Sequence, residues 1–177
     1  MLKRRRLTTA AQDAILPHME KRLSRWGIGP RTFLPTLAYG SVAWAATRTW
    51  PDVCVLQSHP YAVFATAACI LLALGAAMWL TAVISVMRAY NRDELVTSGV
   101  FALVRHPVYS SAIVFNLPGI ALLTRSWPLF LMPLVAYTIF KLLIHREDEY
   151  LERRFGQAYL EYRARVNELI PIPRFGR

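Results

Sequence analysis

The stretch YAVFATAACILLALGAAMWLTAVISVM, residues 61–87, contains no charged side chain over 27 consecutive positions. An α-helix rises about 1.5 Å per residue, so roughly 20 mostly apolar residues are enough to cross the hydrocarbon core of a bilayer. The stretch is therefore long and apolar enough to form a transmembrane helix. This segment predicts an integral membrane protein, and the rest of the chain is interpreted around it.

Three further apolar runs approach the length of a membrane span, at residues 32–50, 108–124 and 127–144. The first is the weakest, because Pro35 lies inside it and Arg48 lies near its end. Only Arg125 and Ser126 separate the last two, which predicts a tight helical hairpin. The sequence thus predicts an all-α integral membrane fold with about four transmembrane helices. A basic arm, 1–31, precedes one membrane domain, 32–177.

The positive charges lie mainly in three segments. The net charge is +10, and 18 of the 21 Lys and Arg residues fall in 1–31, 88–107 and 145–177. The positive-inside rule then places both termini and the 88–107 connection in the cytoplasm. Four spans likewise require both termini to lie on one side of the membrane. Attraction to anionic lipid is favoured over nucleic-acid binding, because the basic residues lack the interleaved aromatics of such modules. Two cysteines, Cys54 and Cys69, form neither a disulfide framework nor a metal site.

Two features inside the spans predict helix packing. Small residues recur every four positions along the second span, at Ala65, Cys69, Ala73 and Ala77, and indicate a close approach of another helix. Midway along the third span, Pro118 removes a helix hydrogen bond and predicts a kink. The kink lies beside Asn116 and Gly119, where it either shapes a pocket or serves packing alone.

The C-terminal segment 146–170 predicts an amphipathic helix lying on the membrane surface. Apolar side chains recur at steps of three and four residues, at Leu151, Phe155, Tyr159, Tyr162, Val166 and Leu169. Gly156 marks a bend or a join between helices. The acids Glu147, Asp148 and Glu149 gain nothing from an anionic surface, so a positive partner is expected. That partner is either Arg105 or a cationic ligand.

The stretch LVRHPVYSS, 103–111, places polar side chains at the start of the third span. Pro107 is preset for the first helical turn, so His106 is expected at the N-cap and Tyr109 in the first turn. Taken singly, Arg105 is an interfacial anchor, His106 a cap and Tyr109 part of an aromatic belt. Taken together with Glu147 across the hairpin, they predict a cytoplasmic site with charges of both signs, which suits a zwitterionic ligand.

The segment ELVTSGVFALVRHPVYSS, 94–111, resembles the central motif of the isoprenylcysteine carboxyl methyltransferase family and its phospholipid methyltransferase relatives. In that motif a Leu-Val-Thr-x-Gly approach precedes Arg-His-Pro-x-Tyr. The segment EDEYLERRFGQAYLEYRARVNELIP, 147–171, is similar to the family's paired acids, Phe-Gly-x-x-Tyr-x-x-Tyr and closing Ile-Pro. Two motifs in this order, separated by a hairpin of spans, are more specific than either motif alone.

The resemblance implies a membrane enzyme that transfers a methyl group from S-adenosylmethionine to a lipophilic acceptor. Carried over by position, the implied cofactor contacts are Gly99, Arg105, His106, Tyr109, Glu147 and Asp148. Arg105, His106 and Glu147 are the implied catalytic residues. Arg105 with the helix N-terminus suits the cofactor carboxylate, and Glu147 suits its ammonium. Arg163 and Arg165 are weaker candidates for acceptor recognition.

The sequence departs from the family pattern at two positions. Asp148 stands where a second glutamate is usual, and Ser111 stands where a glycine is common. The acceptor therefore stays open among a prenylcysteine carboxylate, a phospholipid amine and a small thiol. An NADPH-dependent membrane reductase of the steroid-reductase type and a non-catalytic membrane protein are the alternatives to a methyltransferase.

Overall fold

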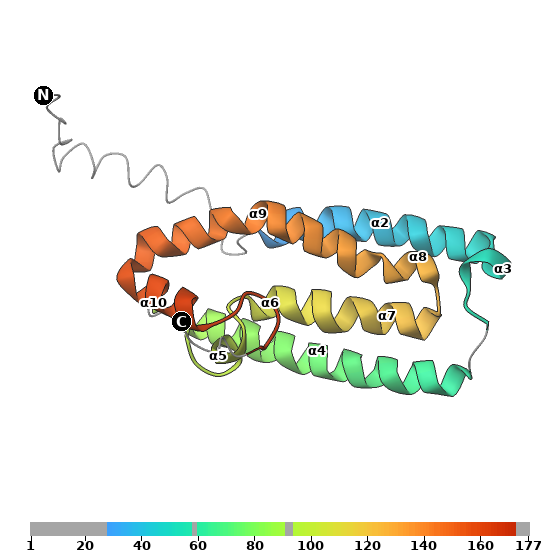
Figure 1. The fold of residues 1–177 in the computed structure, drawn as a ribbon, viewed down its shortest axis with the longest axis horizontal. Coiled ribbons are helices and arrows are strands. Elements are labelled where there is room, and N and C mark those ends of the chain that lie inside the picture. The colour runs from blue at the N-terminus through green and yellow to red at the C-terminus, as the bar shows by residue number, and fades with distance from the viewer. Residues whose placement is uncertain (1–27, 58–59, 91–93, 173–177) are drawn as a thin grey trace, which may run out of the picture.

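The computed structural model describes residues 28–57, 60–90 and 94–172, and their regular structure is helical apart from one isolated bridge between Val55 and Ser126. Four long helical segments lie side by side (Figure 1). They are α2 (Gly29–Thr49), α4 (Tyr61–Tyr90), the continuous run α6 (Pro107–Ser110), η1 (Ser111–Asn116) and α7 (Leu117–Thr124), and α9 (Met132–Phe155). Four shorter helices are α3 (Pro51–Cys54), α5 (Val100–Leu103), α8 (Trp127–Phe130) and α10 (Gln157–Arg165). The predicted all-α fold is confirmed.

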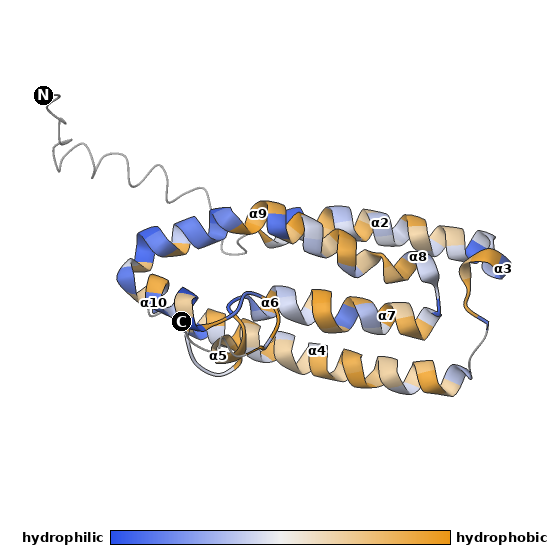
Figure 2. Ribbon diagram, in the orientation of Figure 1, coloured by the Kyte–Doolittle hydropathy of each residue, from blue (hydrophilic) through white to orange (hydrophobic). Residues whose placement is uncertain are grey.

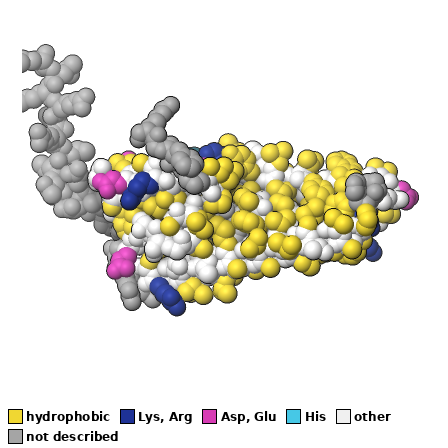
Figure 3. Space-filling model, turned by 60° about the horizontal axis from the view of Figure 1, so that its bottom comes forward, with side chains coloured by type: hydrophobic (Ala, Val, Ile, Leu, Met, Phe, Trp, Pro, Cys, Tyr) yellow, Lys and Arg dark blue, Asp and Glu magenta, His cyan; other side chains and the backbone are white. Residues whose placement is uncertain are grey.

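Three helices in the described part of the chain are long and apolar enough to cross a membrane, namely Tyr61–Ala89, Pro107–Thr124 and Trp127–Phe155. They contain the predicted spans 61–87, 108–124 and 127–144. Large apolar side chains remain exposed along them, as expected of surfaces that face lipid. Figure 2 shows apolar residues along α4 and α7 and over the part of α9 nearer α8, whereas the part of α9 nearer α10 is hydrophilic. Figure 3 shows one face largely covered by hydrophobic side chains, with charges near its ends.

The weakest predicted span, 32–50, forms helix α2 but is not among these three. Its threonines make it less apolar, although their hydroxyls are satisfied by the helix itself. Thr36 Oγ1 donates to Thr32 O at 2.8 Å, and Thr47 Oγ1 donates to Ala43 O at 2.7 Å. The helix packs along α9. Its crossing of the membrane stays a prediction, because α2 is not among the three helices that are long and apolar enough. Residues 1–27 of the predicted arm 1–31 lie outside the described residues.

The helices pack as two pairs, α4 against η1 and α7, and α2 against α9. On α4 the buried small residues are Ala68, Gly75 and Ala82, seven residues apart. The predicted stripe was wrong, since Ala65 is half-buried and the others in it are exposed, namely Cys69, Ala73 and Ala77. The physical reason is the period of about 3.6 residues, which rotates a four-residue repeat around the helix while a seven-residue repeat nearly keeps its face.

Gly75 marks the closest approach within the α4 pair. A Cβ at Gly75 would lie 2.0 Å from Asn116 Oδ1, so no larger side chain fits there without movement. Asn116 ends η1, a π-helical segment that stops two residues before Pro118. Since Pro118 has no N–H to give to Val114, the regular ladder is interrupted at this turn. The distortion expected at Pro118 thus takes the form of a π-helix rather than a plain kink.

The predicted hairpin between the third and fourth spans is tight and locked by polar contacts. Arg125 takes a left-handed conformation, with φ of 51°, and ends α7. Ser126 is fully buried, and its hydroxyl lies 2.6 Å from that of Thr47 on α2. Trp127 Nε1 donates to Val53 O at 3.1 Å. These polar contacts therefore hold this end of the bundle together.

Candidate functional site

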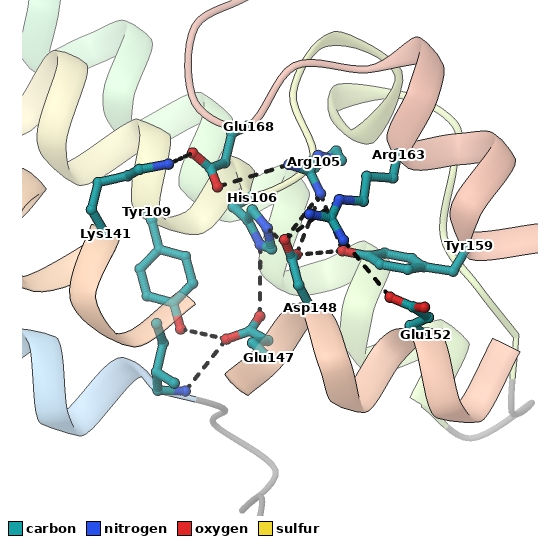
Figure 4. A network of polar contacts seen from close by, with 11 residues as sticks. Arg105, His106, Tyr109, Lys141, Glu147, Asp148, Glu152, Tyr159, Arg163 and Glu168 are labelled. Carbon is teal, nitrogen blue, oxygen red and sulfur yellow. Dashed lines mark hydrogen bonds and ion pairs between the residues drawn. The ribbon is translucent and has the colours of Figure 1, made fainter. Parts of the chain in front are cut away.

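A charged cluster centred on Arg105, His106, Glu147 and Asp148 lies at the end of the bundle where α2 and α6 begin. Figure 1 shows that α4 ends and α9 leads into α10 at the same end of the bundle. His106 is the N-cap of α6 and Pro107 is its first residue, as the sequence predicted. Helix α9 continues past residue 144 to Phe155, so Glu147 and Asp148 project from a helical extension of the fourth span. Figure 4 shows these side chains converging with those of α6 and α10. Arg105 contacts Asp148, and His106 contacts both Asp148 and Glu147, so the three predicted residues lie in one cluster. Their roles in catalysis and cofactor binding stay predictions.

Arg105 and Asp148 form the buried centre of the cluster. Arg105 Nη1 lies 3.3 Å from each carboxylate oxygen of Asp148, and their side chains are only 5% and 7% exposed. Tyr159 from α10 donates its hydroxyl to Asp148 and accepts from Arg105 Nη1 at 3.3 Å. Burial and the Asp148 carboxylate raise the pKa of Tyr159 above its ordinary value, so the phenol keeps its proton. Asp148 is thus the internal counter-ion of Arg105.

His106 lies between the two acids of α9. Its Nε2 is 3.2 Å from Asp148 Oδ1, and its Nδ1 is 3.7 Å from Glu147 Oε1. Burial alone would lower the pKa of His106, but hydrogen bonds and charge from Asp148 and Glu147 outweigh it and raise the pKa above its ordinary value. The His106 and Phe140 rings make a T-shaped contact, with their centroids 5.8 Å apart. The geometry favours an imidazolium with both N–H groups directed at carboxylates.

Glu147 is the more accessible acid, with 21% of its side chain exposed against 7% for Asp148. Its Oε2 accepts from Tyr109 Oη at 3.1 Å and from the backbone N–H of Ile28 at 3.4 Å. Ile28 is the N-cap of α2, so the positive end of a 21-residue helix faces this carboxylate. Glu147 therefore joins α2, α6 and α9 and keeps one side toward the surface.

The C-terminal tail holds the Arg105–His106 backbone. Arg105 N–H donates to Asn167 O at 2.7 Å, and His106 N–H donates to Glu168 O at 3.1 Å. Ser110 Oγ donates to Leu169 O at 2.6 Å. The predicted amphipathic helix 146–170 breaks at Gly156, as anticipated, with φ of 55°. Its end was wrong, because α10 stops at Arg165 and the following residues leave the helix to bond with the residues around α6.

Three residues of the cluster were missed by sequence reasoning. Tyr159 was named only as part of the apolar stripe, and Lys141 and Glu168 were not assigned to the site. Lys141 Nζ lies 2.7 Å from Glu168 Oε2, and Arg105 Nη2 lies 3.8 Å from Glu168 Oε1. The sequence did hold a signal for Tyr159, because Leu151, Phe155 and Tyr159 share one predicted helix face that begins just after the acids 147–149.

The other predicted residues, Arg163, Arg165 and Gly99, differ in whether they reach the cluster. Arg163 reaches the cluster, with Nε 4.0 Å from Asp148 Oδ2 and Nη1 3.7 Å from Glu152 Oε2. Arg165 instead donates to Glu161 O of its own helix. Gly99 starts α5 with φ of 62°, and a Cβ there would meet nothing within 4 Å. A glycine is favoured at position 99 because of its positive φ and not because of lack of space. The role of Gly99 as a cofactor contact stays a prediction.

Comparison with known proteins identifies similar methyltransferases. The chain is 30% identical over 86 residues to protein-S-isoprenylcysteine O-methyltransferase B of Arabidopsis thaliana, covering 49% of this chain and 44% of that protein. It is 37% identical over 83 residues to protein-S-isoprenylcysteine O-methyltransferase of Schizosaccharomyces pombe, covering 46% and 35%. The aligned parts are therefore less than half the length of these curated relatives.

The profile of the phospholipid methyltransferase family matches residues 61–158, and no solved structure matches the chain significantly. The matched range runs from α4 through the Arg105–His106 turn to the acids of α9 and into α10. It covers more than half of the 177 residues. The chain belongs to the phospholipid methyltransferase family.

Proposed function

We propose that the chain is a membrane enzyme that transfers a methyl group from S-adenosylmethionine to the carboxylate of a prenylated cysteine. The observation that carries this proposal is the convergence of Arg105, His106 and Glu147 at one end of the apolar bundle. Such a site meets a charged donor from the aqueous side and a lipophilic acceptor from the membrane. The related proteins named as isoprenylcysteine O-methyltransferases supply the acceptor class.

The residues present fit the methyl donor, which carries a carboxylate, an ammonium and a sulfonium. The Nε of Arg105 is buried and has no hydrogen-bond partner among the described residues, so it leaves a donor for a carboxylate. Glu147 is partly exposed and suits the ammonium. When bound, the donor supplies a methyl group whose S–C bond breaks, returning its electron pair to sulfur, as an acceptor oxygen forms the new O–C bond.

The state of His106 supports a carboxylate acceptor over an amine. An amine must lose a proton before attack, which requires a base. His106 is engaged by Asp148 and Glu147 and favours its protonated form, so it is poorly suited to accept that proton. A carboxylate attacks without losing a proton. The role left to His106 is to fix Glu147 and Asp148 in place, and catalysis then rests on alignment and on exclusion of water.

The test is methyl transfer by the purified chain in lipid vesicles. Radiolabelled S-adenosylmethionine is offered with N-acetyl-S-farnesylcysteine, with phosphatidylethanolamine and with a small thiol. We expect a base-labile methyl ester on the farnesylcysteine, lost in Glu147→Gln but kept in Glu149→Gln, whose side chain is 59% exposed. Label in phosphatidylethanolamine or the thiol instead would overturn the acceptor. Thermal stabilisation by NADPH, without any by S-adenosylhomocysteine, would favour the reductase alternative.

A further inference from the structure

Lys141 is the unusual charge of the fourth span. It is the one charged side chain of the predicted span 127–144, within the helix Trp127–Phe155, and a charge inside a span is costly and marks a candidate functional position. Seven residues separate it from Asp148, so the two share one stripe of α9 and are about 10 Å apart along the axis. Its side chain is 46% exposed. Lys141 therefore sits on the membrane side of the buried cluster.

Glu168 joins Lys141 to that cluster. One carboxylate oxygen lies 2.7 Å from Lys141 Nζ and the other lies 3.8 Å from Arg105 Nη2 (Figure 4). The Glu168 carbonyl accepts from the N–H of His106, and the Glu168 side chain is 22% exposed. A carboxylate thus already occupies the space between a membrane-side cation and the site.

The charges of the cluster leave room for one more anion when the donor is present. When His106 is protonated, four cationic groups face four carboxylates, namely Arg105, His106, Lys141 and Arg163 against Glu147, Asp148, Glu152 and Glu168. S-adenosylmethionine brings a net charge of +1. An acceptor with one negative charge restores neutrality in this poorly solvated place, whereas a neutral or cationic headgroup does not.

The surroundings of Lys141 suit a lipid chain. Leu142 beside it on α9 is 67% exposed, and Ile170 and Ile172 in the tail beyond Glu168 are also exposed. An acceptor with a carboxylate on an apolar chain matches a cation and a carboxylate whose chain neighbours expose apolar side chains.

We propose that Lys141 is the docking cation for the acceptor carboxylate and that Glu168 occupies it until the acceptor arrives. This inference rests on the proposed function and names the residues that select an anionic acceptor. Glu168 is a built-in competitor, because its carboxylate presents to Lys141 and Arg105 the group that the acceptor presents. A purely structural tether between the tail and α9 is the alternative, and it predicts different behaviour of the two variants.

The experiment compares Lys141→Gln, Glu168→Gln and the double variant, as full chains in vesicles. The acceptor is N-acetyl-S-farnesylcysteine, and its uncharged carboxamide is the binding control. We expect Lys141→Gln to raise the acceptor KM about tenfold or more, with the donor KM unchanged. Glu168→Gln should lower the acceptor KM, since the competing carboxylate is gone, and the double variant should resemble Lys141→Gln. Arg153→Gln, which changes an exposed cation paired with Glu149, should leave both constants unchanged.

A second readout does not need turnover. The farnesylcysteine carboxylate should raise the melting temperature of the unmodified chain more than the carboxamide does, and Lys141→Gln should abolish the difference. Equal effects of Lys141→Gln and Glu168→Gln on KM, or an unchanged KM in both, would overturn the inference. If the unmodified chain transfers no methyl group, the proposed function fails, while the melting comparison still decides whether Lys141 binds the carboxylate.

Discussion

Arg105 and Asp148, 43 residues apart in the chain, form a buried ion pair in which Arg105 Nη1 lies 3.3 Å from both carboxylate oxygens of Asp148. Breaking a buried pair leaves one charge uncompensated and costs about 3–5 kcal/mol. We therefore expect Asp148→Asn to lower the free energy of unfolding by that order, measured by denaturant titration in detergent. The exposed pair of Glu149 and Arg153 is the control, since Glu149→Gln should cost only about 0.3–0.5 kcal/mol. Equal losses in both variants would contradict this account.

The contact between Gly75 and Asn116 predicts a rescue experiment. A Cβ at position 75 would lie 2.0 Å from Asn116 Oδ1 and 2.9 Å from Phe115 Cβ, so Gly75→Ala forces α4 and η1 apart. Overpacking of this kind costs about 1–3 kcal/mol. Adding Asn116→Ala removes the nearer obstacle and should restore part of the loss, visible as a coupling energy in a double-mutant cycle of unfolding. Strictly additive effects would show that the two residues do not limit each other.

The position of His106 between two carboxylates predicts a pH dependence of stability. The pKa of His106 is raised in the folded chain, so the folded chain binds this proton more tightly than the unfolded chain. Its contribution is complete below the ordinary value of 6.5 and is lost as the pH rises through the folded-state pKa. We expect the unfolding free energy of the unmodified chain, relative to His106→Gln, to fall as the pH increases above 6.5. A difference that grows with pH would have the wrong sign.

The bond from Ser110 to Leu169 predicts local opening of the site. Ser110 is fully buried, and its hydroxyl donates to Leu169 O at 2.6 Å. Ser110→Ala leaves that carbonyl without this donor, at a cost of about 1–3 kcal/mol. Because the same tail segment accepts from the N–H groups of Arg105 and His106, these amides should exchange faster in the variant. Hydrogen exchange with mass spectrometry measures this, and Ser85→Ala is the control, because the Ser85 hydroxyl donates within its own helix to Thr81 O.

Much of the membrane part follows from local properties of the sequence. Hydropathy over about 20 residues is enough to locate the helices that contain 61–87, 108–124 and 127–144. The start of α6 at Pro107 and the break of the tail at Gly156 follow from the backbone preferences of those two residues. The four-residue stripe on α4 failed because residue size alone does not say which face of a helix meets its neighbour.

The residues of the cluster that carry motif letters could be chosen from the sequence, because Arg105, His106 and Glu147 stand in two recognisable segments. The residues that pair with them could not be chosen from the sequence. That Arg105 is paired with Asp148, that Tyr159 bonds both, and that Glu168 bridges Arg105 and Lys141 are contacts between helices and a tail distant in the chain. The sequence determined which segments are apolar and where helices begin, since these depend on neighbouring residues. Only the tertiary structure decided which charges neutralise each other, because that depends on distances and burial created when the helices pack.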